Sequence, residues 1–286
     1  MARRLIAALL LALGANLAGA VPSAVQVPSL DRPGGTAVLL PASWFASTAA
    51  APAPAMVLMH GCGGLFDGRG QLATRYTELA ARLNALGVHV LVTDSLTPRG
   101  EKQLCTQRVG QRSVTQLQRR RDALGALQWL AAQPGVDAAR LGLLGWSNGG
   151  STVLAALNLR HPEVAAAPLR PSLAVAFYPG CEAELQRGFE ASAPLLMLLG
   201  ELDDWTAAAP CKALAQSAGQ GAALQWEAYA GAYHGFDGTA PLRLRRDVPG
   251  GVNPGLGVHV GGNAAANAAA ALRLSQFLQE RWSLRP

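Results

Sequence analysis

The clearest chemical signal in the sequence is a serine framed by glycines, in Gly145-Trp146-Ser147-Asn148-Gly149-Gly150. An apolar run precedes this motif, and a segment rich in alanine and leucine follows it. Gly-x-Ser-x-Gly between a strand and a helix is typical of a nucleophile elbow, a turn so tight that only glycine fits at its flanks. The hydroxyl of Ser147 would lie beside the first amides of a helix, where negative charge is favoured. The motif predicts a nucleophilic serine; a packing turn with an inert serine is the alternative.

A serine hydroxyl is a weak nucleophile until a base accepts its proton, so a histidine should follow Ser147 in the chain. Of the five histidines we favour His234, which follows a predicted strand, with His259 in a glycine-rich stretch as the alternative. A carboxylate should orient the histidine. We expect Asp203 in this role, with its neighbour Asp204 as the alternative.

Acyl transfer also requires hydrogen-bond donors for the oxyanion. The backbone N–H of Asn148 directly follows the nucleophile and is the first candidate. The second is the N–H of Cys62 or Gly61, in the glycine-rich turn His60-Gly61-Cys62-Gly63-Gly64. Trp146 and Trp205 flank the expected catalytic residues, so we assign them to an apolar substrate pocket; simple packing of both rings is the alternative.

Short apolar runs alternate along the chain with segments of helical periodicity. Continuous apolar strands separated by helices are typical of an α/β protein whose mostly parallel sheet is covered by helices on both faces. The predicted strands are residues 55–59, 88–93, 141–145, 173–178, 195–199 and 223–229. The predicted helices are residues 71–86, 113–132, 149–159, 207–217 and 263–281. Nothing divides this pattern, so residues 21–286 are predicted to form one domain.

Residues 1–20 have the pattern of a secretory signal peptide. Two arginines precede a short apolar stretch, which ends in Ala18-Gly19-Ala20, a small-x-small cleavage site. An uncleaved anchor is the alternative, although the stretch is short for a membrane span. No later segment has 18 uninterrupted apolar residues, so we expect no stable membrane insertion after cleavage. The predicted location is the periplasm or the exterior.

The sequence contains four cysteines, which an oxidising compartment permits to pair. None lies in a CxxC motif, so neither metal binding nor redox chemistry is expected. Four cysteines allow three connectivities. We favour Cys181–Cys211, because both residues lie just beyond predicted strands, with Cys62–Cys105 as the complement.

Composition excludes several classes of protein. With 50% hydrophobic and 15% charged residues, the 286-residue chain is too apolar to be disordered. The formal net charge of +6 would be compatible with binding to nucleic acid, but most basic residues are single arginines scattered along the chain. No zinc-finger spacing or aromatic RNA-binding signature accompanies them, so no nucleic-acid partner is expected. We interpret the one dense run, Arg119-Arg120-Arg121, as a solvated helix face.

The elbow, the turn at residues 60–64, Asp203 and the motif His234-Gly235-Phe236-Asp237 together resemble the dienelactone hydrolase family of α/β-hydrolases, over about residues 38–282. The resemblance implies the α/β-hydrolase fold, no cofactor, and hydrolysis of an ester or lactone by Ser147, Asp203 and His234. Founding members of the family carry cysteine at the nucleophile position, so Ser147 favours a serine-esterase mechanism. The stretch 94–100 resembles one in other family members, which suggests that Arg99 holds a substrate carboxylate; a surface arginine is the alternative.

Two other functions are compatible with these motifs. A secreted serine peptidase of the prolyl-oligopeptidase type shares the elbow and the order of catalytic residues, but the chain has no room for a propeller domain before the hydrolase domain. A hydrolase-fold binding protein without activity is the other alternative, although such proteins usually lack a triad residue. The substrate, the size of its acyl group and the oligomeric state are left open.

Overall fold

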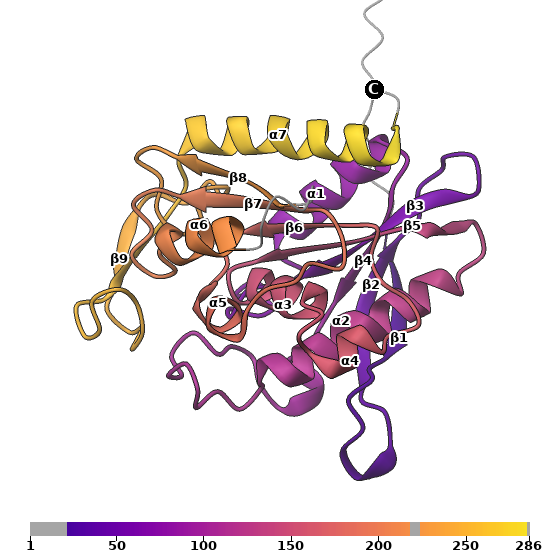
Figure 1. Cartoon of the computed structure of the whole chain (residues 1–286), viewed down its shortest axis with the longest axis horizontal. Coiled ribbons are helices and arrows are strands. Elements are labelled where there is room, and N and C mark those ends of the chain that lie inside the picture. The colour runs from indigo at the N-terminus through magenta and orange to yellow at the C-terminus, as the bar shows by residue number, and fades with distance from the viewer. Residues whose placement is uncertain (1–21, 218–223, 285–286) are drawn as a thin grey trace, which may run out of the picture.

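The structure, a computed structural model, describes residues 22–217 and 224–284. The predicted signal peptide at residues 1–20 therefore lies outside the described residues, as does Ala223 at the start of a predicted strand. Eight strands form one sheet in the order β1-β2-β4-β3-β5-β6-β7-β8. Helices cover both faces of this sheet (Figure 1), as the alternating sequence pattern predicted.

Six parallel strands make up most of the sheet. They are β3 (Ala53–Met59), β4 (His89–Thr93), β5 (Val136–Trp146), β6 (Leu173–Phe177), β7 (Leu195–Gly200) and β8 (Leu224–Tyr229). Each corresponds to a predicted strand. Two antiparallel strands, β1 (Ser23–Pro28) and β2 (Leu39–Phe45), extend the sheet on the β4 side and were not predicted.

The two faces of the sheet form separate apolar layers. In β3, Val57 and Met59 point into one layer, while Met56 and Leu58 point into the other. The first layer packs against α2 (Gln116–Ala131), α3 (Asn148–Leu157) and α6 (Ala208–Ser217). The second packs against α1 (Thr74–Ala85) and α7 (Ala264–Trp282), the long helix along one side of Figure 1. Burial on both faces explains why the central strands β3, β6 and β7 are apolar throughout.

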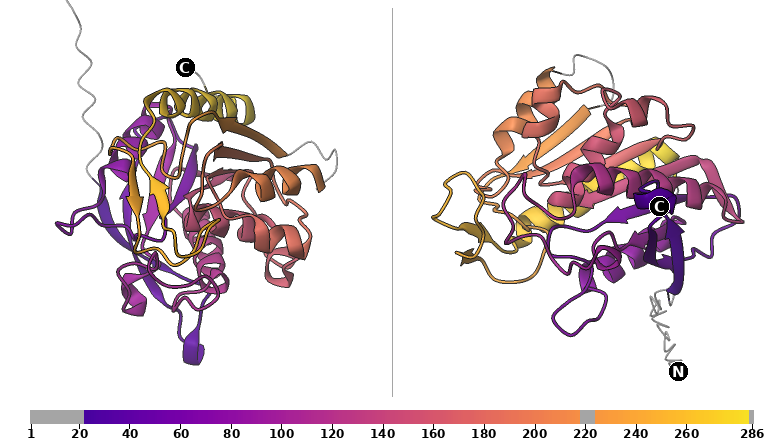
Figure 2. Two further views of the ribbon diagram at one scale, coloured as in Figure 1. Left: turned by 90° about the vertical axis from the view of Figure 1, so that its left-hand side faces the viewer. Right: turned by 90° about the horizontal axis from the view of Figure 1, so that it is seen from below.

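Smaller elements lie in the connections. They are the 3-10 turns η1 (Pro33–Gly35) and η2 (Thr97–Arg99), the short helices α4 (Pro162–Ala165) and α5 (Glu182–Arg187), and the strands β9 (Arg243–Arg245) and β10 (Val258–Val260). β9 and β10 pair antiparallel and face the viewer in the left panel of Figure 2. β10 lies in a glycine-rich stretch in which the sequence indicated only a loop. The residues between the two strands, 246–257, are called the 246–257 loop below.

Both favoured disulfides are present. Cys62 pairs with Cys105, and Cys181 pairs with Cys211. The first joins the turn after β3 to a long loop before α2, and the second joins the start of α5 to α6. Within residues 22–217 and 224–284, no helix is both long and apolar enough to cross a membrane.

The interpretation of the arginine run as a solvated helix face is wrong. Arg119 is fully buried and Arg120 is 7% exposed, although both lie on α2. Arg120 and Arg121 reach across to Glu163 of α4, at 2.9 and 2.5 Å. Arg119 points instead toward the loops at the end of β3 and β5. The run of three arginines in the sequence does not show that this side of α2 packs against other elements.

Candidate active site

Ser147 occupies a strained turn between β5 and α3. Its φ of +53° is a conformation that residues with a side chain rarely adopt. The flanking glycines are required, because a Cβ at Gly145 would lie 2.3 Å from the carbonyl oxygen of Gly149. A Cβ at Gly149 would lie 2.0 Å from the carbonyl oxygen of Met59. The expected nucleophile elbow is therefore present, and its glycines allow the turn to pack against the end of β3.

Ser147, His234 and Asp203 form a chain of hydrogen bonds. His234 Nε2 lies 2.9 Å from Ser147 Oγ, and His234 Nδ1 lies 2.8 Å from Asp203 Oδ2. The side chains of His234 and Asp203 are only 4% and 0% exposed. This arrangement allows Nε2 to accept the serine proton while the Nδ1–H donates to the carboxylate.

The local turn after β7 holds Asp203 in place. Its Oδ1 accepts hydrogen bonds from the backbone N–H groups of Trp205 and Thr206, both at 2.9 Å. The rings of Tyr178 and Trp205 each lie 4.6 Å from the ring of His234, centroid to centroid. Backbone N–H groups thus hold Asp203, and two aromatic rings pack beside His234, so the position of each residue does not depend on their mutual contact alone.

The two alternatives considered for these roles pair with each other. Asp204 Oδ2 lies 2.6 Å from His259 Nδ1, and Asp204 Oδ1 accepts the backbone N–H of His259 at 2.8 Å. The consecutive carboxylates Asp203 and Asp204 thus contact two different histidines. Only the pair of Asp203 and His234 reaches the hydroxyl of Ser147.

The predicted oxyanion donors lie at the start of α3, for Asn148, and in the turn after β3, for Cys62. Neither the backbone N–H of Asn148 nor that of Cys62 donates to any other group in the described part of the chain. Gly61 packs against the elbow, since a Cβ at this position would lie 3.7 Å from Ser147 Cβ. These free N–H groups are suited to an oxyanion that forms beside Ser147.

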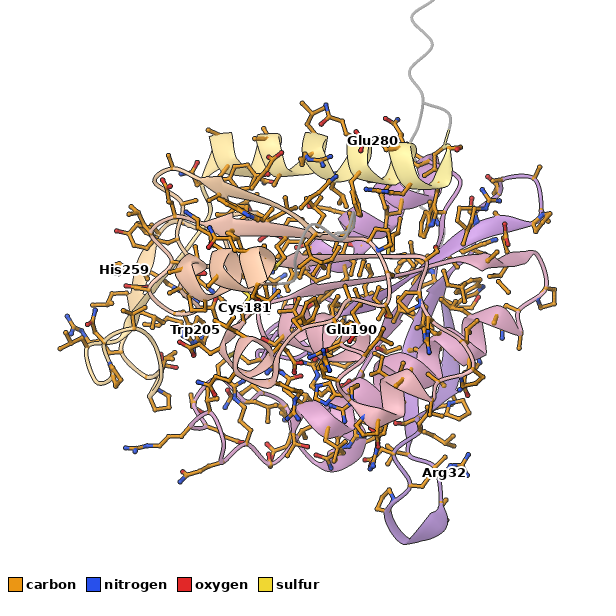
Figure 3. The ribbon with its side chains drawn as sticks, in the orientation of Figure 1. Arg32, Cys181, Glu190, Trp205, His259 and Glu280 are labelled. Carbon is orange, nitrogen blue, oxygen red and sulfur yellow. A yellow bond between two sulfur atoms is a disulfide. The ribbon has the colours of Figure 1, made fainter. Side chains whose placement is uncertain are left out.

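Ser147 opens into a cavity of about 670 Å³. Asn148, the predicted oxyanion donor, and Trp205, predicted to bind substrate, also line this cavity. Cys181 and Trp205 lie close together in Figure 3, and both belong to its wall. Residues 250–252 of the 246–257 loop line another part of the wall.

Two residues expected to bind substrate lie elsewhere. Trp146 is 2% exposed and does not line this cavity; its Nε1–H donates to Asp237 at 2.7 Å, and its ring packs in the core. Arg99 contacts both carboxylate oxygens of Asp122, at 2.8 and 2.9 Å, and Asp31 at 2.9 Å. Both substrate-binding assignments are therefore corrected. Arg99 is not a surface arginine either, because its side chain is only 9% exposed.

Arg112 also lines the cavity, although it was not among the residues predicted for the site. Its buried Nε has no hydrogen-bond partner in the described residues, and burial lowers the pKa of its guanidinium. Thr206 was also missed, although its hydroxyl lies 3.1 Å from Asp203 Oδ2 and donates to the carbonyl oxygen of Tyr178 at 2.9 Å. Arg112 stands in a polar loop without a motif. The spacing Asp203-x-x-Thr206 could have indicated a turn closed by the carboxylate.

The sheet, the elbow and the order of the site residues define an α/β-hydrolase. The sequence profile of the dienelactone hydrolase family matches residues 40–281, and the chain belongs to this family. No curated protein matches the sequence.

Among solved structures, the chain is similar to P91, a dienelactone hydrolase-like promiscuous phosphotriesterase from metagenomic libraries. The identity is 22%, with 91% of this chain and 99% of that chain covered and a TM-score of 0.63. Esterase 2 of Thermogutta terrifontis, phosphorylated by paraoxon, is 16% identical, with 93% and 97% covered and a TM-score of 0.63. A putative dienelactone hydrolase from Klebsiella pneumoniae is 20% identical, with 76% and 88% covered and a TM-score of 0.57. These similarities show a shared fold.

Proposed function

We propose that this member of the dienelactone hydrolase family is a serine-dependent hydrolase of carboxylic esters or lactones. The observation that carries the proposal is the hydrogen-bond chain from Asp203 through His234 to Ser147, which ends at a cavity. The catalytic residues would be Ser147 as nucleophile, His234 as base and Asp203 as the group that orients the base.

The geometry supports a two-step mechanism. His234 Nε2 accepts the proton of Ser147 as the serine oxygen attacks the substrate carbonyl carbon. The N–H groups of Asn148 and Cys62 stabilise the oxyanion of the tetrahedral intermediate. His234 then gives its proton to the alkoxide oxygen of the leaving group. The alcohol departs, and the acyl group remains bonded to Ser147. A water molecule attacks this acyl-enzyme with the same assistance from His234 and releases the acid.

The cavity supports a small substrate. Its volume of about 670 Å³ suits a molecule of modest size. Arg112 contributes a cation to the wall of the cavity, and its buried Nε has no hydrogen-bond partner within the described residues. An ester that carries a negative group would contact Arg112, so we propose that the enzyme prefers anionic esters to neutral analogues.

Labelling with a fluorophosphonate, followed by mass spectrometry, tests the proposal. We expect a single labelled serine, Ser147, and loss of both label and ester turnover in Ser147→Ala. Ser151→Ala is the matched control, because Ser151 lines the same cavity and its hydroxyl is not part of the hydrogen-bond chain. The turnover assay pairs a neutral ester with an analogue that carries a carboxylate, and includes an amide to separate esterase from peptidase activity. Unchanged ester turnover in Ser147→Ala would contradict the proposal.

We also propose that the protein acts in an oxidising compartment. Two disulfides lie at the cavity, where Cys105 and Cys181 form part of the wall. Such bonds persist in the periplasm and outside the cell rather than in the cytosol. Export by a cleaved leader at residues 1–20 is tested by N-terminal sequencing of protein recovered from the periplasm or medium.

A further inference from the structure

Arg119 is a buried cation at the base of the proposed active site. It is 0% exposed and lies near the start of α2. Its neighbours Arg120 and Arg121 both pair with Glu163, whereas Arg119 forms no ion pair within the described residues. Burying a cation without a counter-charge costs free energy. Burial lowers the pKa of Arg119 only to about 10, so the group stays charged at neutral pH.

Two of the hydrogen bonds that the Arg119 side chain forms lead to the segments that hold the proposed oxyanion donors. One terminal nitrogen donates to the carbonyl oxygen of His60 at 2.6 Å, directly before the Gly61-Cys62 turn. The other donates to Oδ1 of Asn148, the residue that directly follows the nucleophile. A planar guanidinium offers several donors in a fixed arrangement. One rigid group therefore joins the loop after β3 to the elbow after β5.

The carboxylate that acts on Arg119 is that of Asp122, but Asp122 already pairs with Arg99 at 2.8 Å. Burial, together with the positive charge of Arg119, lowers the pKa of His60 to about 3, so His60 is neutral. Asn148 contributes only an amide oxygen. The positive charge thus persists beneath the site where the oxyanion would form, in a region from which water is excluded. Charge stabilisation is strongest in such an environment.

We propose that Arg119 is a positioning residue for the oxyanion hole: it fixes the separation of the Cys62 and Asn148 N–H groups and adds a buried positive charge behind them. Arg119 does not line the cavity, so it acts through these two loops rather than by contact with substrate. The proposal rests on the proposed esterase function. It predicts that loss of Arg119 weakens binding of the transition state more than binding of the ester.

The test compares Arg119→Met and Arg119→Lys with Arg120→Met as the matched control. An alkylboronic acid reports on the oxyanion hole, because boron accepts the serine oxygen, the serine proton passes to His234, and a tetrahedral anion forms. For Arg119→Met we expect kcat to fall about 10- to 100-fold, less than the 10²–10³-fold cost of losing a donor. The inhibition constant of the boronic acid should rise by a similar factor while KM changes less than about twofold.

The other variants separate this role from general stability. Arg119→Lys keeps the charge but lacks the forked guanidinium that reaches both loops, so its affinity for the boronic acid should lie between those of the wild type and Arg119→Met. If Arg119→Met does not fold, the affinity of Arg119→Lys should still be below that of the wild type. Arg120→Met should lower the melting temperature without changing kcat. Equal losses of kcat in Arg119→Met and Arg120→Met, or wild-type boronic acid affinity in Arg119→Lys, would overturn the proposal. An inactive wild type, or an active Ser147→Ala variant, would instead contradict the esterase function itself.

Discussion

The neighbouring residues Asp203 and Asp204 each hold a histidine by nearly the same contact, in very different surroundings. The carboxylate oxygen and ring nitrogen are 2.8 Å apart for Asp203 and His234, and 2.6 Å apart for Asp204 and His259. The side chain of His234 is 4% exposed and that of His259 is 41% exposed. Contact distance alone therefore does not distinguish the pair that we propose to be catalytic from the other pair.

The difference begins in the backbone after β7. Asp203 turns inward, where two N–H groups of its own turn bind its second oxygen. Asp204 faces the other way, toward β10, and its carbonyl oxygen accepts the backbone N–H of Val252 at 2.8 Å. Asp203 thus contacts His234, the proposed base, whereas Asp204 anchors the 246–257 loop that lines the cavity.

Asp203 and His234 form the inner pair, and Asp204 and His259 form the outer pair. Burial strengthens the contacts of the inner pair. Hydrogen bonds and charges interact more strongly where water is excluded, and His234 has a third partner in the hydroxyl of Ser147. His259 lies at the surface against the ring of Tyr233, with a centroid distance of 5.0 Å, and no serine is within its reach in the described residues. Of the two pairs, only that of Asp203 and His234 contacts a serine hydroxyl, as the proposed proton transfer requires.

The largest predicted effect tests this difference directly. Asp203→Asn should lower kcat by about 10³–10⁴-fold, because an amide at this position stabilises the wrong tautomer of His234 and no charge faces the imidazolium. Asp204→Asn is the matched control and should change kcat less than about threefold. Steady-state kinetics on one ester measures both. Equal losses in the two variants would mean that exposure does not separate the roles of the two pairs.

The inner pair was predictable from the sequence because its chemistry is tied to the order of the fold. Glycines frame Ser147, an apolar strand precedes Asp203, and His234 follows the next one, so each residue stands at a strand end. The central parallel strands β3, β6 and β7 were predictable for a related reason, since burial on both faces makes them apolar throughout. Such features leave local marks in the sequence.

Features that depend on side-chain direction left no such marks. Trp146 is adjacent to Ser147, yet successive residues of a strand point to opposite faces, and its ring enters the core away from the cavity. Arg99 and Arg119 look like surface residues by type, and only the packing of distant segments buries them. β1 and β2 were missed because they are partly exposed and lack a continuous apolar run.

A third histidine sharpens the comparison, because His60 is fully buried without a carboxylate in hydrogen-bond contact. Burial lowers the pKa of His60 to about 3 from its ordinary value of 6.5. Between these values the unfolded chain binds a proton that the folded protein does not, so stability falls as pH drops below 6.5 and is fully present above it. We expect the free energy of unfolding to lose up to about 1.4 kcal/mol per pH unit through this residue.

Urea unfolding between pH 7 and pH 4.5 measures this slope. In His60→Gln the neutral amide still offers an acceptor for the N–H of Ser95, which His60 Nε2 accepts at 3.2 Å. The variant should therefore unfold with a shallower pH dependence than the wild type, even if it is less stable at pH 7. Identical slopes in the two proteins would show that His60 takes up no proton on unfolding.

The smallest predicted effect concerns the outer pair. His259→Gln removes a half-exposed contact with Asp204, an interaction of a kind that contributes about 0.2–1 kcal/mol, so the 246–257 loop should loosen without unfolding the domain. We expect KM to rise about two- to fivefold with kcat unchanged, and limited proteolysis to cut this loop faster. His89→Gln, on β4, is the control, because His89 does not line the cavity. A tenfold loss of kcat in His259→Gln would show that the outer histidine takes part in proton transfer. This result would contradict the assignment of different roles to the two pairs.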